Sequence, residues 1–129
     1  MNNIQAMLIE KAKSAMEFAY APYSEFRVGA ALLTDTGKIY TGSNVENRSF
    51  GATCCAERTA VFKAVSEGER SFKAIAIYSS GKSATAPCGI CRQVLSEFSE
   101  DMTVLFCGTN EEIVETTLLE LLPMSNIEL

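Results

Sequence analysis

FRVGAALLTDTGKIYTGSNV, residues 26–45, consists of two largely apolar stretches that flank the polar turn TDTG. The stretches 26–33 and 38–45 have the length and composition of strands. Gly37 ends the turn and supplies the backbone freedom that a tight reversal requires. The segment therefore predicts a β-hairpin.

Helices and strands alternate around this hairpin. Helical spacing of apolar residues, capping signals and the breakers Gly68 and Pro123 mark the other elements. They are a helix within residues 1–20, a helix at 55–67, a strand at 72–79, a helix at 88–99, a strand at 102–107 and a helix at 117–122. A hairpin followed by such alternation predicts a mixed sheet with helices on its faces. We expect one domain, residues 1–129, with an α/β fold: a three-layer α/β/α sandwich around a mixed sheet of about five strands.

Composition and charge limit the partners of the chain. Its 129 residues are 47% hydrophobic, yet no apolar run approaches the roughly 18 residues of a membrane span. The N-terminus lacks the basic start and apolar block of a secretory signal, so we expect a cytoplasmic protein that does not bind membranes. The net charge of −5 and the lack of a long basic run argue against a long nucleic-acid partner.

Histidine is absent from the sequence, whereas cysteine occurs five times. Without an imidazole, proton transfer near neutral pH must use a carboxylate, a thiol, a lysine or a tyrosine whose pKa the site has adjusted. In a reducing cytoplasm, clustered cysteines indicate metal binding or catalysis more often than disulfides.

Three of the cysteines have the spacing of metal ligands. Cys88 and Cys91, in the segment PCGIC at 87–91, are close enough in sequence for both sulfurs to reach one ion at the start of a helix. Cys55 lies at another predicted helix start, and the adjacent Cys54 has no partner in this scheme and is expected to be a packing thiol. Three protein ligands with an open fourth position are typical of a catalytic zinc ion, so we predict one Zn²⁺ per chain.

The charged pair that follows Cys55 fits this site. Zinc with three thiolates carries a net negative charge, which the positive ends of two helices and the guanidinium of Arg58 can offset. Glu57 lies two residues beyond Cys55, which places a carboxylate beside the open coordination position. In a chain without histidine, we predict that Glu57 is the acid and base for a zinc-activated water.

The combination of 55-CAE-57 and 87-PCGIC-91 resembles the signature of zinc-dependent deaminases. Beyond that signature, the chain is similar to the small, homotetrameric cytidine deaminases along nearly its whole length. The similar segments are 20–47, 54–68 from Cys55 onward, 88–98 and 119–123.

This resemblance implies hydrolytic deamination of cytidine or deoxycytidine to uridine or deoxyuridine and ammonia, with pyrimidine salvage as the role. Zinc-bound hydroxide would attack C4 of cytosine while Glu57 moves the protons. Phe26 would lie against the pyrimidine, Asn44 and Glu46 would hold the sugar hydroxyls, and the backbone around Ala56 would help to hold the base. The resemblance also implies a homotetramer.

Asn44 and Glu46 support a nucleoside substrate on physical grounds. They alternate on a predicted strand and so face the same way, and a carboxylate accepts from a ribose hydroxyl but repels a 5′-phosphate. Three features depart from the family pattern, at positions that bear on selectivity and subunit contacts: Arg48, Phe50 and the C-terminal segment MSNIEL at 124–129.

Three other functions remain open at this point. The same zinc site serves deaminases of other cytosine nucleosides, such as blasticidin-type antibiotics. The pair Cys88 and Cys91 alone would suit a small redox protein. A zinc-stabilised binding protein without catalysis would use the same ligands.

Overall fold

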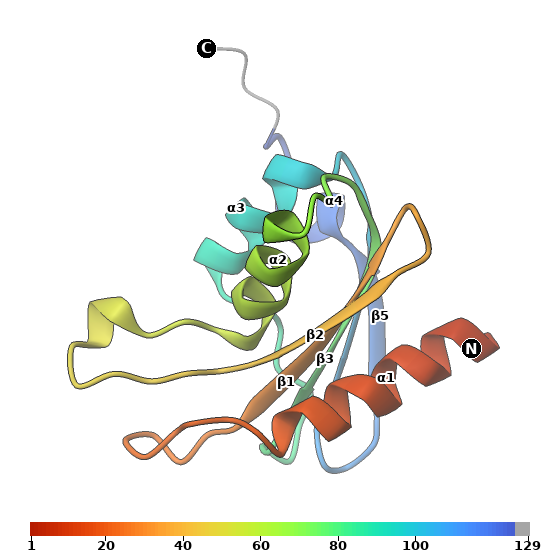
Figure 1. Cartoon of the computed structure of the whole chain (residues 1–129). Coiled ribbons are helices and arrows are strands. Elements are labelled where there is room, and N and C mark those ends of the chain that lie inside the picture. Colours follow the sequence, from red (N-terminus) through yellow and green to blue (C-terminus); the bar gives the residue numbers. More distant parts are fainter. Residues whose placement is uncertain (126–129) are drawn as a thin grey trace.

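The computed structural model describes residues 1–125, and a five-stranded sheet with the strand order β2-β1-β3-β4-β5 forms its centre (Figure 1). The strands are β1 (Val28–Thr34), β2 (Ile39–Ser43), β3 (Phe72–Ser79), β4 (Thr103–Cys107) and β5 (Ile113–Thr117). β3 and β4 pair in parallel, whereas every other neighbouring pair is antiparallel. The mixed sheet predicted from the alternation of elements is therefore confirmed.

Helices cover both faces of this sheet, as Figure 1 shows. They are α1 (Asn3–Met16), α2 (Ala56–Ser66), α3 (Gly89–Phe98) and the short α4 (Leu118–Leu121), with a 3-10 turn, η1, at Phe50–Ala52. Successive residues of β1 point to opposite faces, so Ala30 packs in the apolar cluster under α2 and α3 and Ala31 in the cluster under α1. The three-layer α/β/α sandwich is thus confirmed. No helix within residues 1–125 is long and apolar enough to cross a membrane.

The hairpin forms where the sequence predicts it. Its turn closes through the N–H of Gly37, which donates to the carbonyl of Thr34 at 3.0 Å, and Gly37 itself has a φ of 89°. The second strand is shorter than predicted, because β2 ends at Ser43. Beyond it, Val45 forms only isolated bridges with Tyr20 and Cys54, so the chain from position 44 onward leaves the sheet.

The predicted helices also form: α1 lies within the predicted range, and α2, α3 and α4 are each shorter by one residue at both ends. α2 ends before Gly68, whose φ of 100° is the left-handed conformation that stops a helix. The side chain of Thr117 caps α4 by accepting from the N–H of Glu120 at 3.3 Å.

The fifth strand is the element that the sequence pattern does not locate. β5 lies at the edge of the sheet, and its residues are exposed or only half-buried. A strand without a buried face lacks the alternation of apolar and polar residues by which strands are recognised. Its neighbour β4 ends in Cys107, which is buried and donates through Sγ to the carbonyl of Gly108 at 3.3 Å.

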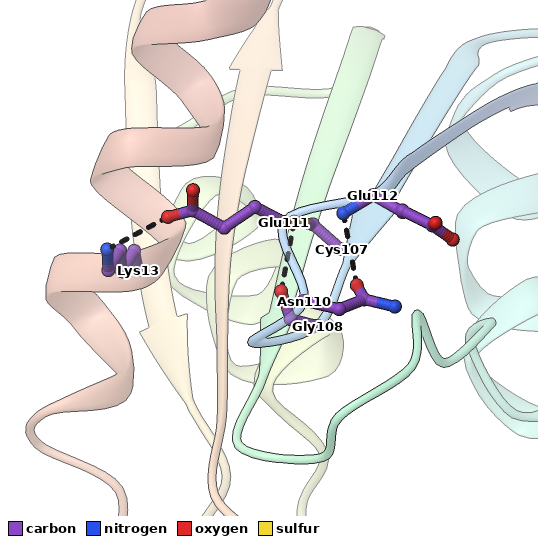
Figure 2. Close-up of polar contacts among 6 residues, drawn as sticks. All are labelled: Lys13, Cys107, Gly108, Asn110, Glu111 and Glu112. Carbon is purple, nitrogen blue, oxygen red and sulfur yellow. Dashed lines mark hydrogen bonds and ion pairs between the residues drawn. The ribbon is translucent and has the colours of Figure 1, made fainter.

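Figure 2 shows the turn that joins β4 to β5. The N–H of Glu111 donates to the carbonyl of Gly108 at 3.0 Å, and the N–H of Glu112 donates to Oδ1 of Asn110 at 3.0 Å. The carboxylate of Glu111 forms an ion pair with Lys13 of α1 at 3.8 Å. These contacts attach the edge of the sheet to α1, on the face opposite α2 and α3.

Candidate functional site

Two helix N-termini define the candidate metal centre. α2 begins directly after Cys55 and α3 directly after Cys88, and both cysteines have the extended backbone of an N-cap residue. The N-terminus of a helix carries about half a positive charge. That charge stabilises the thiolate form of a cysteine placed there.

Three sulfur atoms come together between these helices. Sγ of Cys88 lies 3.8 Å from Sγ of Cys55 and 3.4 Å from Sγ of Cys91. All three sulfurs lie within 4.8 Å of one another. A tetrahedral zinc ion with Zn–S bonds of ~2.3 Å places its sulfur ligands ~3.8 Å apart, so the cluster fits zinc. Cys54 stands outside this cluster, and its Sγ accepts from Oγ1 of Thr59 at 3.5 Å.

Arg58 lies against the cluster from the first turns of α2. Its Nη2 donates to Sγ of Cys55 at 3.4 Å and lies 3.5 Å from the carbonyl of Thr53. Hydrogen bonds from Cys91 and from Arg58 lower the pKa of Cys55 to about 5. The hydrogen bond to Cys55, together with burial, raises the pKa of Cys91. These contacts favour the thiolate form of Cys55, which lies beside the guanidinium of Arg58.

Glu57 is a buried carboxyl group at the start of α2, with only 5% of its surface exposed. Burial raises its pKa, and the negative charge of Cys55 adds to the shift. An acidic side chain with a raised pKa can both accept and release a proton near neutral pH.

Glu57 and Cys88 both line a cavity of about 290 Å³. Most of the residues predicted for the site line it: Phe26, Asn44, Glu46, Cys55, Ala56, Glu57 and Cys88. Cys91 is fully buried and Arg58 is in contact with Cys55, so these two complete the metal side without lining the cavity. The volume is near the lower end of the range for small-molecule sites.

Asn44 lines the cavity, and both the oxygen and the nitrogen of its amide form hydrogen bonds with the main chain. Oδ1 accepts from the N–H of Val28 at 2.8 Å, and Nδ2 donates to the carbonyl of Phe26 at 2.8 Å. Asn44 was predicted to lie on a strand, but it follows the end of β2. Asn44 nevertheless lines the cavity. Its amide attaches the chain that follows β2 to residues 26–28, where β1 begins.

Glu46 is held by the loop before β1. Its Oε1 accepts from the N–H groups of Tyr23 at 3.0 Å and Ser24 at 3.1 Å, and its Oε2 accepts from the hydroxyl of Ser24. The Ser24 hydroxyl is the main cause of a lowered pKa for Glu46. A carboxylate has about four acceptor positions. The cavity rim therefore carries a fixed negative charge with about one acceptor position left.

The ring of Phe26 has a defined position because Gly81 leaves room for it. A Cβ atom on Gly81 would lie 2.9 Å from Cε2 of Phe26, closer than carbon atoms approach. A side chain at position 81 would force the aromatic ring to move.

Several cavity residues were not anticipated from the sequence. They include Ser24, Ile77, Ser79 and Thr85. Ser79 ends an otherwise apolar strand, and Ser24 lies in a polar turn, so neither carries a pattern that distinguishes it from its neighbours.

Two of the three departures from the family pattern can be placed relative to the cavity of the single chain. Neither Arg48 nor Phe50 lines it. Phe50 is 76% exposed, and its ring meets that of Tyr23 edge to face at 6.2 Å. Residues 126–129 of the C-terminal segment lie outside the part of the chain that the structure describes.

Known proteins share this fold and about half of the aligned residues. The family model for the cytidine and deoxycytidylate deaminase zinc-binding region matches residues 2–107. A cytidine deaminase of Sporosarcina psychrophila is 52% identical over 117 residues, which are 90% of this chain and 86% of that protein. Another from Halalkalibacterium halodurans is 51% identical over 91% of this chain and 89% of its own length. The crystal structure of cytidine deaminase from Burkholderia pseudomallei matches with a TM-score of 0.89 and 46% identity, covering 96% of this chain and 98% of that one.

Proposed function

The chain belongs to the cytidine and deoxycytidylate deaminase family, and we propose that its cavity catalyses hydrolytic deamination of cytidine and deoxycytidine to uridine and deoxyuridine. One observation carries the mechanism: the buried Glu57 lines the same cavity as Cys55 and Cys88, two residues of the sulfur cluster. An acid–base group and the proposed metal ligands can therefore act on one substrate bound in this cavity.

Cys55, Cys88 and Cys91 are the proposed ligands of one zinc ion per chain, in keeping with the zinc-binding region of the family. Zinc, when bound there, supplies Lewis-acid activation of a water molecule. Glu57 takes a proton from this water and delivers it to ring N3 of cytosine. The oxygen of this water would bond to C4 as N3 gains its proton. Glu57 would then carry the proton of the new C4 hydroxyl to the amino group, so that the C4 carbonyl forms, the C–N bond breaks and ammonia leaves.

The rest of the cavity positions the nucleoside. The ring of Phe26 packs against the pyrimidine, and the main chain at Ala56 binds the edge of the base. Asn44 and the remaining acceptor position of Glu46 bind sugar hydroxyls. Because Glu46 is held ionised by Ser24, the rim repels a 5′-phosphate, and this favours nucleosides over nucleotides.

Arg58 is the proposed charge partner of the thiolates, and Arg58→Ala tests this role. Removing the guanidinium raises the pKa of Cys55 from its lowered value, so protons compete with zinc for the sulfur at higher pH. We expect the midpoint of zinc release in an acid titration, followed with a zinc-sensitive dye, to move upward by about one pH unit. Arg58→Lys keeps the charge, so its midpoint of zinc release should lie between those of the wild type and Arg58→Ala. An unchanged midpoint in Arg58→Ala would contradict the role.

The alternative functions are less well supported. A redox pair needs only Cys88 and Cys91, and does not explain why Cys55 and a buried Glu57 lie at the same place. A binding protein without catalysis has no use for an acidic group of raised pKa beside the metal site. A blasticidin-type substrate would share the zinc chemistry, but the relatives at about half identity are cytidine deaminases.

Turnover provides the direct test of this function. Cytidine, deoxycytidine and blasticidin S are supplied separately, and loss of the substrate absorbance is followed together with ammonia release. We expect turnover of both nucleosides, little of the antibiotic, and loss of all turnover after treatment with a zinc chelator. A purified chain with about one zinc but no ammonia release would overturn the function.

We further propose that the chain acts as one domain, in the cytoplasm, as a homotetramer that serves pyrimidine salvage. Large exposed apolar side chains support association: Phe18 is 83% exposed, and Phe50, in the turn η1, is 76% exposed. Light scattering of the purified protein measures the number of chains directly.

A further inference from the structure

Ser79 is the last residue of β3 and lies on the side of the sheet that faces α2 and α3. Side chains two apart on a strand point the same way, so Ser79 follows Ile77, which belongs to the core cluster under those helices. Both residues line the cavity. The Ser79 side chain is nevertheless shielded from solvent, with 1% of the residue exposed.

The hydroxyl of Ser79 has no hydrogen-bond partner among residues 1–125. Buried polar groups in folded proteins nearly always have one, because an unmade hydrogen bond destabilises the fold. The neighbouring Ser80 shows the usual arrangement, since its Oγ accepts from the N–H of Arg27 at 2.9 Å. The unpaired hydroxyl of Ser79 therefore lowers the stability of the folded chain, and no hydrogen bond within residues 1–125 compensates for it.

Several neighbours of Ser79 are apolar residues that line the same cavity. Val28 pairs with Ser79 across the sheet, and Ile77 and Phe26 line the same wall. A Cβ atom placed on Gly81 would lie 3.8 Å from Oγ of Ser79 and 2.9 Å from Cε2 of Phe26. The hydroxyl and the aromatic ring are therefore both close to Gly81. A single polar group in such a wall orients a ligand.

We propose that Ser79 is a further substrate-binding residue, whose hydroxyl hydrogen-bonds a polar atom of the nucleoside packed against Phe26. This inference rests on the proposed deaminase function and extends it. The hydroxyl remains unpaired in the free protein and gains its partner when the nucleoside enters. It adds one polar contact to the apolar contacts that Phe26 and Ile77 offer in the same cavity.

Ser79→Ala tests the proposal, because the variant loses a hydroxyl that contributes no bond to the free fold. We expect its melting temperature to equal or exceed that of the wild type. We expect its KM for cytidine to rise about tenfold with a smaller change in kcat, which corresponds to one lost hydrogen bond. Ser79→Thr retains a hydroxyl and should restore most of the affinity.

Ser99→Ala is the matched control. Its hydroxyl, at the far end of α3, donates to the carbonyl of Asp101 at 2.9 Å, so its loss should lower the melting temperature and leave KM unchanged. A KM of Ser79→Ala within twofold of the wild type, or a fall in melting temperature like that of Ser99→Ala, would overturn the role of Ser79 alone. A wild-type chain without ammonia release would overturn the proposed function as well.

Discussion

Glu57→Gln is expected to lower kcat for cytidine by at least about a thousandfold while zinc stays bound. Glutamine has nearly the same shape as glutamate and can still hydrogen-bond, but it cannot take up a proton from water or pass one to N3 and the amino group. Since no histidine exists in the chain, no imidazole can replace it. The fold should be retained, because a neutral side chain suits a buried position whose carboxyl group already has a raised pKa.

Single-turnover kinetics, zinc content and melting temperature are measured together on this variant. Glu69→Gln provides the matched control, because Glu69 is also a buried carboxyl group but accepts from Oγ1 of Thr36 at 2.7 Å, at the hairpin turn. It should keep full turnover and lose stability. Wild-type turnover in Glu57→Gln would refute the acid–base role, and loss of zinc would reassign Glu57 to the metal.

The sequence reveals those parts of the site that depend on local chain geometry. Cys55 and Cys88 are recognisable because each precedes a helical pattern, and the helices do begin at the next residue. Glu57 and Arg58 follow in the first turn of α2, so the helix geometry of a few residues determines their distance from Cys55. The hairpin is predictable for the same reason, since Gly37 lies within the turn that it permits.

The parts that could not be predicted depend on contacts between distant segments. Ser24 reaches Glu46 across 22 positions, and the room for Phe26 is created at Gly81. No periodicity in the sequence records such a pairing. β5 was missed for a different reason, since an edge strand with little burial has no apolar face to reveal it. The resemblance identified Phe26, Asn44 and Glu46 as site residues. The contacts that hold their side chains in place are visible only in the folded structure.

Cys55→Ser and Cys54→Ser are expected to differ completely, although the two cysteines are adjacent. Cys55 lies in the sulfur cluster and receives a hydrogen bond from Arg58. A serine hydroxyl does not ionise near neutral pH and therefore cannot replace a thiolate ligand. We expect Cys55→Ser to hold far less than one zinc per chain, to lose at least about a thousandfold in turnover, and to melt at a lower temperature, because the metal joins the starts of α2 and α3.

Cys54→Ser should retain zinc, and its turnover should be within about twofold of the wild type. Cys54 stands outside the cluster, and its contact with the hydroxyl of Thr59 is one that a serine can also make. Adjacent residues of an extended chain point to opposite sides, so only one of the pair can face the metal. Zinc content by atomic emission and ammonia release under identical conditions compare the two variants. Equal zinc loss in both would show that the sulfur of Cys54 also binds the metal and that the three-ligand site is wrong.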